Sequence, residues 1–150
     1  FHMGYLYRDL KPENIIINQY GYPVLLDFGL CIPRQEAKNC EEEFISGSRY
    51  YLPPERLLGQ GENASSEIYS LGMLMYHALT GRTYFDADEI QALARRHISG
   101  LRLNRAAKMQ GLRSSIAILL DVMLRQEPND RPQDFDYVAD SLKAIIQEID

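Results

Sequence analysis

The sequence predicts one mainly α-helical domain that carries a small β-hairpin near its start. Two short apolar runs, residues 15–17 and 24–26, flank a turn-forming stretch at 18–23, which is typical of a hairpin. Beyond residue 64, apolar residues recur at helical spacing in several segments. The 150 residues, 45% of them hydrophobic and 25% charged, fit one globular domain.

A long irregular segment separates the hairpin from the predicted helices. Residues 27–55 show little periodicity and contain three prolines, which indicates a loop that is either functional or disordered. Ser65 and Ser66 are expected to cap a buried central helix that ends at Gly81, because its apolar residues cover most faces. Three further helices are predicted: one from a capping box at Asp86 and Glu89 to Gly100, one from Ser114 to before Pro128, and one from Phe135 to Ile149.

Composition and charge exclude several classes of protein. Sixteen basic against 21 acidic side chains give a net charge of −5, which argues against a general nucleic-acid binder. Cys31 and Cys40 are too few for a disulfide scaffold and are expected to be free thiols. The longest nearly apolar run, Ile68–Leu79, is too short to span a bilayer, and no signal peptide opens the chain. We therefore expect no nucleic-acid partner, no membrane contact from this segment and a cytoplasmic location, alone or as part of a larger protein.

Two short motifs carry most of the chemical information. Residues 7–14 read Y-R-D-L-K-P-E-N, and D-F-G follows at 27–29, eighteen residues after Asp9 and directly after the second predicted strand. In this spacing and context the sequence resembles the C-terminal lobe of a eukaryotic-type protein kinase of the serine/threonine branch. The alternative interpretation is that Asp9 and Asn14 only cap turns and that Asp27 only ends a strand.

The resemblance implies a role for each polar residue of these motifs. Asp9 would accept or orient the proton of the substrate hydroxyl. Asn14 and Asp27 would hold Mg²⁺ against the phosphates of ATP through hard oxygen ligands. Lys11 would place a cation near the γ-phosphate, and in the family a lysine here accompanies serine or threonine acceptors.

Three further residues are expected at the nucleotide side of the cleft. Phe28 would pack under the cleft, and Gly29 would let the backbone turn away from the metal site. Ile16 resembles the residue that forms the floor beneath the adenine ring. An ordinary core isoleucine is the alternative for Ile16.

The resemblance makes residues 27–55 the activation segment, because Pro54 and Glu55 match the end of the A-P-E motif. Ser48 stands where the family has a hydroxyl that bonds the catalytic aspartate and lysine; a solvated loop serine is the alternative. Glu55 is expected to form a buried ion pair with Arg131 of the sequence N-D-R-P. This pair would lock the segment to the helices.

The sequence departs from the family pattern at two positions. Glu67 replaces the usual aspartate that accepts hydrogen bonds from the backbone of the catalytic loop. Its side chain is one methylene longer, so it could reach the loop with a different geometry. Tyr7 replaces the commoner histidine, and its ring is expected to pack against Phe28.

Charged stretches raise two further expectations. Arg8 would read a phosphate on the activation segment, or instead the acidic run Glu41–Glu43, which could replace that phosphate. A solvated charged loop is the alternative for this run. No acid lies between Glu89 and Asp121, and the basic region Arg95–Arg113 could dock an acidic partner or be a solvated basic face.

The sequence contains no G-x-G-x-x-G loop and no V-A-I-K lysine, so an N-terminal lobe is expected before Phe1. The resemblance thus divides residues 1–150 into a catalytic loop at 7–14, the activation segment at 27–55 and a helical subdomain at 65–150. We expect the γ-phosphate of ATP to pass to serine and threonine hydroxyls of protein substrates. The fragment alone is expected to be inactive, and a catalytically silent scaffold is the alternative function.

Overall fold

The structure is a computed structural model that describes residues 3–39, 49–86, 88–89, 92 and 108–148. Several sequence predictions fall outside these residues and stay predictions. They concern Cys40, the acidic run Glu41–Glu43, Ser48, the helix end at Gly100, and Arg95, Arg96, Arg102 and Arg105.

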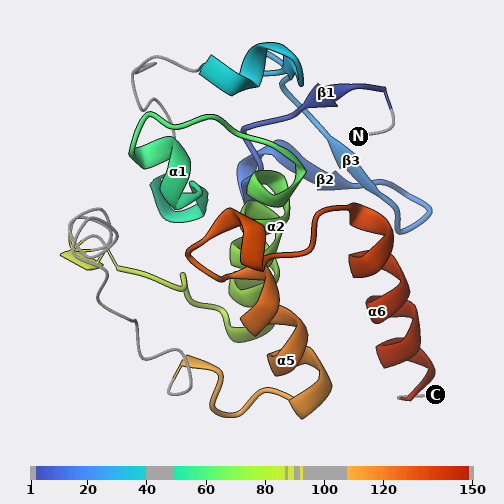
Figure 1. Cartoon of the computed structure of the whole chain (residues 1–150). Coiled ribbons are helices and arrows are strands. Elements are labelled where there is room, and N and C mark those ends of the chain that lie inside the picture. Colours follow the sequence, from blue (N-terminus) through green and yellow to red (C-terminus); the bar gives the residue numbers. More distant parts are fainter. Residues whose placement is uncertain (1–2, 40–48, 87, 90–91, 93–107, 149–150) are drawn as a thin grey trace.

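Short strands make up the start of the chain (Figure 1). Strand β1 (Tyr5–Leu6) pairs antiparallel with β4 (Ile32–Pro33), and β2 (Ile15–Ile17) pairs antiparallel with β3 (Pro23–Leu25). The β2–β3 hairpin is the predicted one, with Ile16 opposite Val24. The pairing of β1 with β4 was not predicted, because two-residue strands are too short to show a period.

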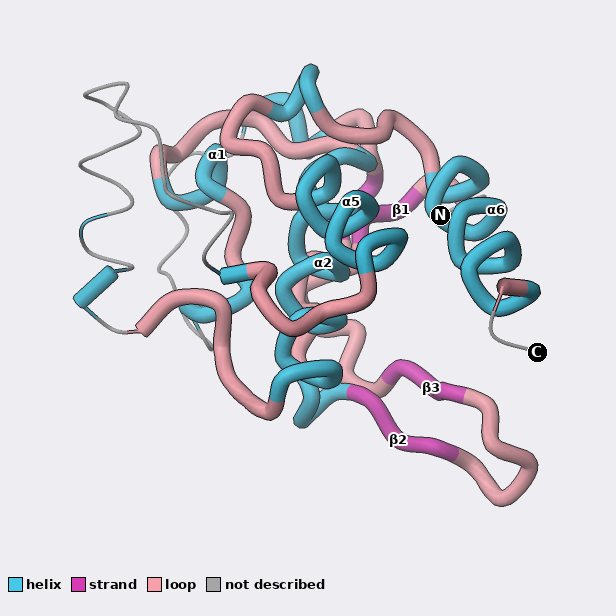
Figure 2. The backbone as a smooth tube through the Cα atoms, turned by 90° about the horizontal axis from the view of Figure 1, so that it is seen from below, coloured by secondary structure: helices cyan, strands magenta, loops and turns pink. Residues whose placement is uncertain are grey.

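The turn between β2 and β3 is held by one side chain. The Asn18 carboxamide oxygen accepts hydrogen bonds from the backbone N–H groups of Tyr20 (2.9 Å) and Tyr22 (3.0 Å). Asparagine favours turns because its side chain can bond the backbone a few residues ahead. Figure 2 shows the resulting hairpin projecting from the helical part of the molecule.

Helix α2 (Ala64–Thr80) lies at the centre of the molecule, as its apolar faces predicted (Figure 1). The predicted cap was wrong by two residues. Asn63 is the N-cap, and it forms a capping box with Ser66, so both predicted cap serines lie in the first turn. Asparagine is at least as good a cap as serine, which is why the sequence did not separate them. The helix stops at Gly81, whose φ of 71° is in the left-handed region.

The remaining helices surround α2. Helix α1 (Pro54–Leu57) precedes it, and α5 (Ser114–Met123) and α6 (Phe135–Gln147) follow. Helix α5 begins at Ser114 as predicted, with Arg113 as its N-cap residue, and Asp134 caps α6. Four short 3-10 helices are also described: Pro12–Asn14, Glu36–Asn39, Arg49–Tyr51 and Pro128–Asp130.

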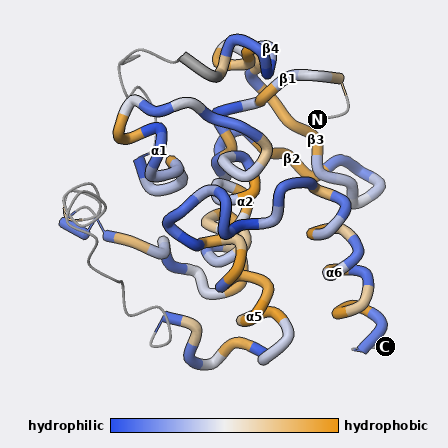
Figure 3. Tube along the Cα trace, in the orientation of Figure 1, coloured by the Kyte–Doolittle hydropathy of each residue, from blue (hydrophilic) through white to orange (hydrophobic). Residues whose placement is uncertain are grey.

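Helix α2 and the end of α5 pack closely because Gly72 of α2 has no side chain. A Cβ added to Gly72 would lie 3.0 Å from Cδ2 of Leu124 and 3.1 Å from Cβ of Met123. The hydropathy colouring in Figure 3 shows apolar residues along α5 and on the β2–β3 hairpin. On α5 these residues enter the core, where Leu120 and Met123 are fully buried. The central helix therefore has neighbours on several sides, as a buried helix requires.

Aromatic rings fill one part of the core. The Tyr84 ring meets the Tyr76 ring edge to face at 4.9 Å and the Phe85 ring at 4.7 Å between centroids.

The predicted capping box at Asp86 and Glu89 is present. Asp86 Oδ1 accepts from the Glu89 N–H (2.7 Å), and Glu89 Oε2 accepts from the Asp86 N–H (3.0 Å). This reciprocal pair confirms the start of the predicted helix.

Two sequence expectations on thiols and membranes are tested by the described residues. Cys31 is a free cysteine, as expected, and burial raises the pKa of its thiol. Within the part of the chain that the structure describes, no helix has the length and apolar character needed to cross a bilayer.

Candidate functional site

The loop at residues 7–14 connects β1 to β2 and closes on itself. Its last residues form a 3-10 turn that begins with Pro12, where a missing N–H costs nothing. Asn14 is buried, and its Nδ2 donates to the backbone oxygen of Asp9 (3.0 Å) and to Asp9 Oδ2 (2.6 Å). The Nζ atom of Lys11 lies 2.9 Å from the same oxygen. The structure thus brings together the three residues that the sequence predicted as catalytic.

The charges of this group remain accessible to solvent. The side chains of Lys11 and Asp9 are 20% and 13% exposed. Because the Asn14 nitrogen is bonded to Asp9, its carbonyl oxygen is the atom suited to bind a cation. The arrangement therefore offers a fixed carboxylate, a neighbouring ammonium and an amide oxygen at one surface.

Asp27 lies directly after the hairpin in a constrained conformation. Its φ is 54°, in the left-handed region, and its Oδ1 accepts from the backbone N–H of Gly29 (3.0 Å). A Cβ added to Gly29 would lie 3.1 Å from that oxygen, so glycine permits the close approach. The Leu26 N–H also donates to the Asn14 backbone oxygen (2.8 Å). This bond ties the segment that carries Asp27 to the loop that carries Asn14.

The donor set fits a divalent cation that is shared with phosphates. Among the described residues, no group of three or more His, Cys, Asp or Glu side chains could hold a metal ion. Mg²⁺ commonly takes only one or two protein oxygen ligands and completes its octahedron with waters and substrate phosphates. Asn14 and Asp27 are of the required type, so the residues fit such an ion and do not fit an all-protein cage.

The rings of Tyr7 and Phe28 meet as predicted. Their centroids are 5.6 Å apart at an interplanar angle of 77°, and the Tyr7 hydroxyl donates to the Leu26 backbone oxygen. Burial and the nearby Asp9 carboxylate raise the pKa of Tyr7 still further above neutral pH, and the protonated phenol is the donor in this bond. Tyr7 therefore makes the expected contact with Phe28 and bonds the loop to the backbone just before Asp27.

The nucleotide-side residues predicted from the sequence are exposed. Phe28 is 63% exposed and Ile16 is 48% exposed, and Ile17 and Val24 of the hairpin are also open to solvent. Ile16 is therefore not a core isoleucine of this chain, and that alternative is wrong. The hairpin and the Phe28 ring instead form an uncovered apolar edge.

Glu67 holds the loop from behind, from the first turn of α2. Its Oε1 accepts from the Arg8 N–H (2.8 Å) and its Oε2 from the Tyr7 N–H (3.2 Å). The extra methylene therefore does not prevent the expected contact. Burial raises the pKa of Glu67, and the Arg8 hydrogen bond opposes that shift. These bonds help to hold Arg8 at a φ of 69°, which is unusual for a residue with a side chain.

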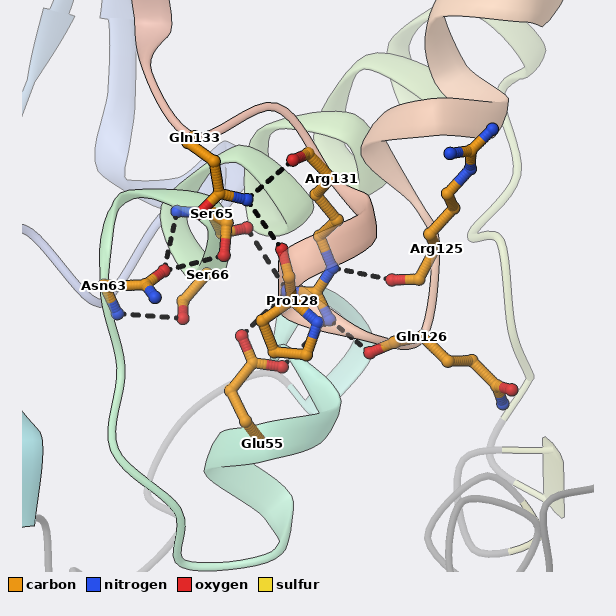
Figure 4. A network of polar contacts seen from close by, with 9 residues as sticks. All are labelled: Glu55, Asn63, Ser65, Ser66, Arg125, Gln126, Pro128, Arg131 and Gln133. Atoms are coloured by element: carbon orange, nitrogen blue, oxygen red, sulfur yellow. Dashed lines mark hydrogen bonds and ion pairs between the residues drawn. The ribbon is translucent and has the colours of Figure 1, made fainter.

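The predicted Glu55–Arg131 ion pair is present and deeply buried (Figure 4). The guanidinium donates to Oε1 of Glu55 at 2.7 Å and to Oε2 at 2.9 Å, and the side chains are 2% (Glu55) and 0% (Arg131) exposed. It also lies 4.6 Å from the Tyr69 ring centroid. Three backbone oxygens accept its remaining N–H groups: those of Arg125, Gln126 and Ser65. A buried charge needs such complete pairing.

Sequence reasoning missed one buried acid near the loop. Glu62 is 4% exposed, and its Oε2 lies 2.9 Å from Nε of Arg8. Its position between Gly61 and the cap residue Asn63 gave no signal, because a glutamate in a polar stretch before a helix is usually solvated. The Arg8 side chain, predicted to read a phosphate, is thus bonded to an acid that no sequence pattern indicated.

The basic region is described only in part. Lys108 Nζ bonds the Tyr84 backbone oxygen (2.6 Å) and both carboxylate oxygens of Glu89 (3.0 and 2.9 Å). Its charge is therefore used within the fold, which weakens the expectation that it serves a docking partner. Arg113 is exposed at the start of α5.

Comparisons with known proteins agree with the geometry. The sequence profile described as "Protein kinase domain" matches residues 1–143. The chain is 30% identical over 146 residues to the probable serine/threonine-protein kinase pknA2 of Bifidobacterium longum, covering 97% of this chain and 19% of that protein. It is 32% identical over 146 residues to the serine/threonine-protein kinase PknL of Mycobacterium tuberculosis, covering 97% of this chain and 37% of that protein.

A third relative shows the same relation. The serine/threonine-protein kinase PksC of Streptomyces coelicolor is 32% identical over 131 residues, which is 86% of this chain and 24% of that protein. The chain thus spans well under half the length of each of these relatives.

Proposed function

Because this chain belongs to the protein kinase family, we propose that it forms the C-terminal lobe of a kinase domain that transfers the γ-phosphate of ATP to serine and threonine hydroxyls of proteins. The observation that carries the proposal is the contact of Asp9 with both Lys11 (2.9 Å) and Asn14 (2.6 Å). The acceptor preference rests on Lys11 and on the names of the relatives.

The proposed reaction assigns one task to each of these groups. The substrate hydroxyl oxygen attacks the γ-phosphorus, the bond from that phosphorus to the β–γ bridging oxygen breaks, and Asp9 orients the hydroxyl and takes its proton. The bonds from Lys11 and Asn14 hold the Asp9 carboxylate in one orientation before substrate arrives. Such positioning is the main contribution that a protein makes to phosphoryl transfer.

Asn14 and Asp27 would hold the divalent cation in this proposal. When bound, Mg²⁺ neutralises charge on the phosphates of ATP. The bond from the Gly29 N–H to Asp27 Oδ1 orients the carboxylate, and the left-handed backbone at Asp27 fixes its direction. The Lys11 ammonium would turn from Asp9 towards the γ-phosphate and bind it.

The exposed apolar edge supports a second lobe over the site. Ile16 and Phe28 are about half exposed or more, and apolar surface of this kind usually serves binding. We assign to the covering lobe the glycine-rich loop and the phosphate-binding lysine, which the present sequence does not contain. The adenine ring would lie between that lobe and Ile16.

The test is phosphate transfer by the full-length protein with Mg²⁺, ATP and a generic basic protein. Asp9→Asn should lower the rate by about 10²- to 10⁴-fold, the usual effect of a lost proton acceptor. Asp140→Asn is the matched control, because Asp140 also lies 2.9 Å from a lysine, Lys143, but at the exposed surface. The control should keep the wild-type rate.

Two results would contradict the proposal. Equal rates for the wild type and Asp9→Asn would show that Asp9 does not take the proton. A wild-type protein that neither binds ATP nor transfers phosphate would favour the silent scaffold.

A further inference from the structure

Four charged side chains, three of them buried, form a group behind the catalytic loop. We call Arg8, Arg56, Glu62 and Glu67 the Arg8 cluster. Glu62 Oε2 lies 2.9 Å from Arg8 Nε and 3.9 Å from Arg56 Nε. A terminal nitrogen of Arg56 donates to the Arg8 backbone oxygen, and Glu67 accepts from the Arg8 backbone N–H at 2.8 Å. Side chain, N–H and carbonyl of Arg8 are therefore each bonded within the cluster.

Because the Arg8–Glu62 pair is buried, each of its charges needs a partner of opposite sign. The side chains of Arg8 and Glu62 are 2% and 1% exposed, so water screens this pair little. The cluster joins two cations to two carboxylates, and its formal charge is balanced. A guanidinium buried at this depth requires a negative partner, and Glu62 supplies it.

The chain around Glu62 fixes this partner in place. The Glu62 N–H donates to the Ala37 backbone oxygen (2.9 Å), and the next residue, Asn63, is held in the capping box of α2. The backbone at Glu62 is thus held on one side by Ala37, which lies within residues 27–55, and on the other by the capped start of α2. The other two members, Arg56 and Glu67, belong to α1 and α2.

The place of the cluster residues in the sequence bears on how the catalytic loop is regulated. Arg56, Glu62 and Glu67 all lie after the segment 27–55, which contains the hydroxyls Ser46 and Ser48 and the run Glu41–Glu43. The negative charge that holds Arg8 in these contacts comes from outside that segment. A phosphate added there would bring a dianion towards a guanidinium that already has a carboxylate.

From these contacts, and resting on the proposed function, we infer that Glu62 is a built-in counter-charge of Arg8 that positions the catalytic loop without phosphorylation of residues 27–55. Glu62 is a positioning residue: it touches neither substrate nor nucleotide and acts on Asp9 through the adjacent Arg8. The kinase is then active as synthesised.

The test uses the full-length protein after phosphatase treatment, with phosphate content checked by mass spectrometry. The phosphate-free wild type should keep at least about half of its kcat. Glu62→Gln, which preserves shape and removes the charge, should lower kcat by about tenfold or more and leave the KM for ATP within about twofold. Glu89→Gln is the matched control, since Glu89 also bonds a cation, Lys108 at 2.9 Å, but outside the cluster. It should behave as wild type.

A second readout separates loop positioning from general stability. Hydrogen exchange of the backbone amides in residues 7–14 should accelerate by about tenfold in Glu62→Gln at a temperature where the amides of α5 keep their wild-type protection. If Glu62→Gln does not fold, the double variant Arg8→Gln with Glu62→Gln decides. Its folding would support charge pairing as the role of Glu62, and its failure would contradict it.

Three outcomes would overturn the inference: loss of wild-type activity on dephosphorylation with recovery on rephosphorylation of Ser46 or Ser48, unchanged kcat in Glu62→Gln, or equal loss of protection in loop and α5. If the wild type transfers no phosphate in any state, the proposed function fails instead. The exchange measurement then still decides whether Glu62 positions the loop.

Discussion

Two lysine- or arginine-to-carboxylate pairs in this chain have similar geometry and different surroundings. Nη1 of Arg131 lies 2.7 Å from Oε1 of Glu55, and Nζ of Lys11 lies 2.9 Å from Oδ2 of Asp9. The first pair is at most 2% exposed, whereas the side chains of the second are 20% and 13% exposed. Distance therefore does not distinguish a pair that holds the fold together from one that is available for chemistry. Burial does, because water screens and competes with the second pair alone.

The two cations also differ in how many of their N–H groups are already bonded within the fold. The planar guanidinium of Arg131 is bonded to Glu55 and to three backbone oxygens, so it cannot turn away without leaving buried acceptors unpaired. The ammonium of Lys11 has three N–H groups, and Asp9 takes one of them. It can rotate towards an arriving phosphate at small cost.

The largest expected effect concerns the accessible site. Asp27→Ala in the full-length protein should reduce Mg²⁺-dependent transfer to background, because the carboxylate proposed to hold the cation is gone. The free energy of unfolding should change much less, since Asp27 is exposed in this chain. Transfer assays across a Mg²⁺ titration, together with denaturant melts, measure both. Wild-type transfer at ordinary Mg²⁺ would show that Asp27 is not a metal ligand.

The buried pair should show the opposite behaviour. Arg131→Ala should cost about 3–5 kcal/mol in the free energy of unfolding, because the Glu55 carboxylate would be buried without a partner. The double variant with Glu55→Ala should cost less than the sum of the two single variants. Denaturant melts of all four proteins check this. Strict additivity would mean that the two side chains do not interact.

Lys11→Met should separate stability from activity. The unfolding free energy should fall by about 1 kcal/mol or less, the range of a solvent-accessible ion pair. The transfer rate should fall far more, because the cation proposed for the γ-phosphate is lost. The same melts and transfer assays measure these effects. A stability loss as large as that of Arg131→Ala would remove the distinction between the two pairs.

The smallest expected effect is a pH dependence at Glu67. Burial raises its pKa above the unfolded value of 4.5, so the folded state binds the proton more tightly than the unfolded chain. Its contribution to stability is then full below the unfolded pKa and is lost as the pH rises through the folded pKa. Glu62 acts in the same direction, and Arg56 and the Arg8 hydrogen bond oppose it.

The check compares melts of the wild type and Glu67→Gln from pH 4 to pH 8. The stability of the wild type relative to Glu67→Gln should decrease with rising pH. An increase would show that the hydrogen bonds from Tyr7 and Arg8 outweigh burial.

Sequence patterns predicted the features whose residues lie close together along the chain. The hairpin and the buried face of α2 involve residues close in sequence, so periodicity reveals them, and motif spacing singles out Asp9, Lys11 and Asn14 as candidate site residues. The Glu62–Arg8 contact joins residues 54 positions apart, and neither belongs to a periodic pattern that points to the other. The N-cap at Asn63 was missed for another reason, because Asn63, Ser65 and Ser66 all satisfy the cap preference and only the geometry selects one.

The Glu55–Arg131 bond also constrains the order in which the chain can fold. Its partners are 76 residues apart, so closing this loop costs chain entropy before the bond returns any stability. During synthesis from the N-terminus, α1 and α2 leave the ribosome well before Arg131. The Glu55 carboxylate must stay hydrated until then, and α1 cannot settle in its final place. The last third of the sequence is therefore needed to fix the first helix in its final position.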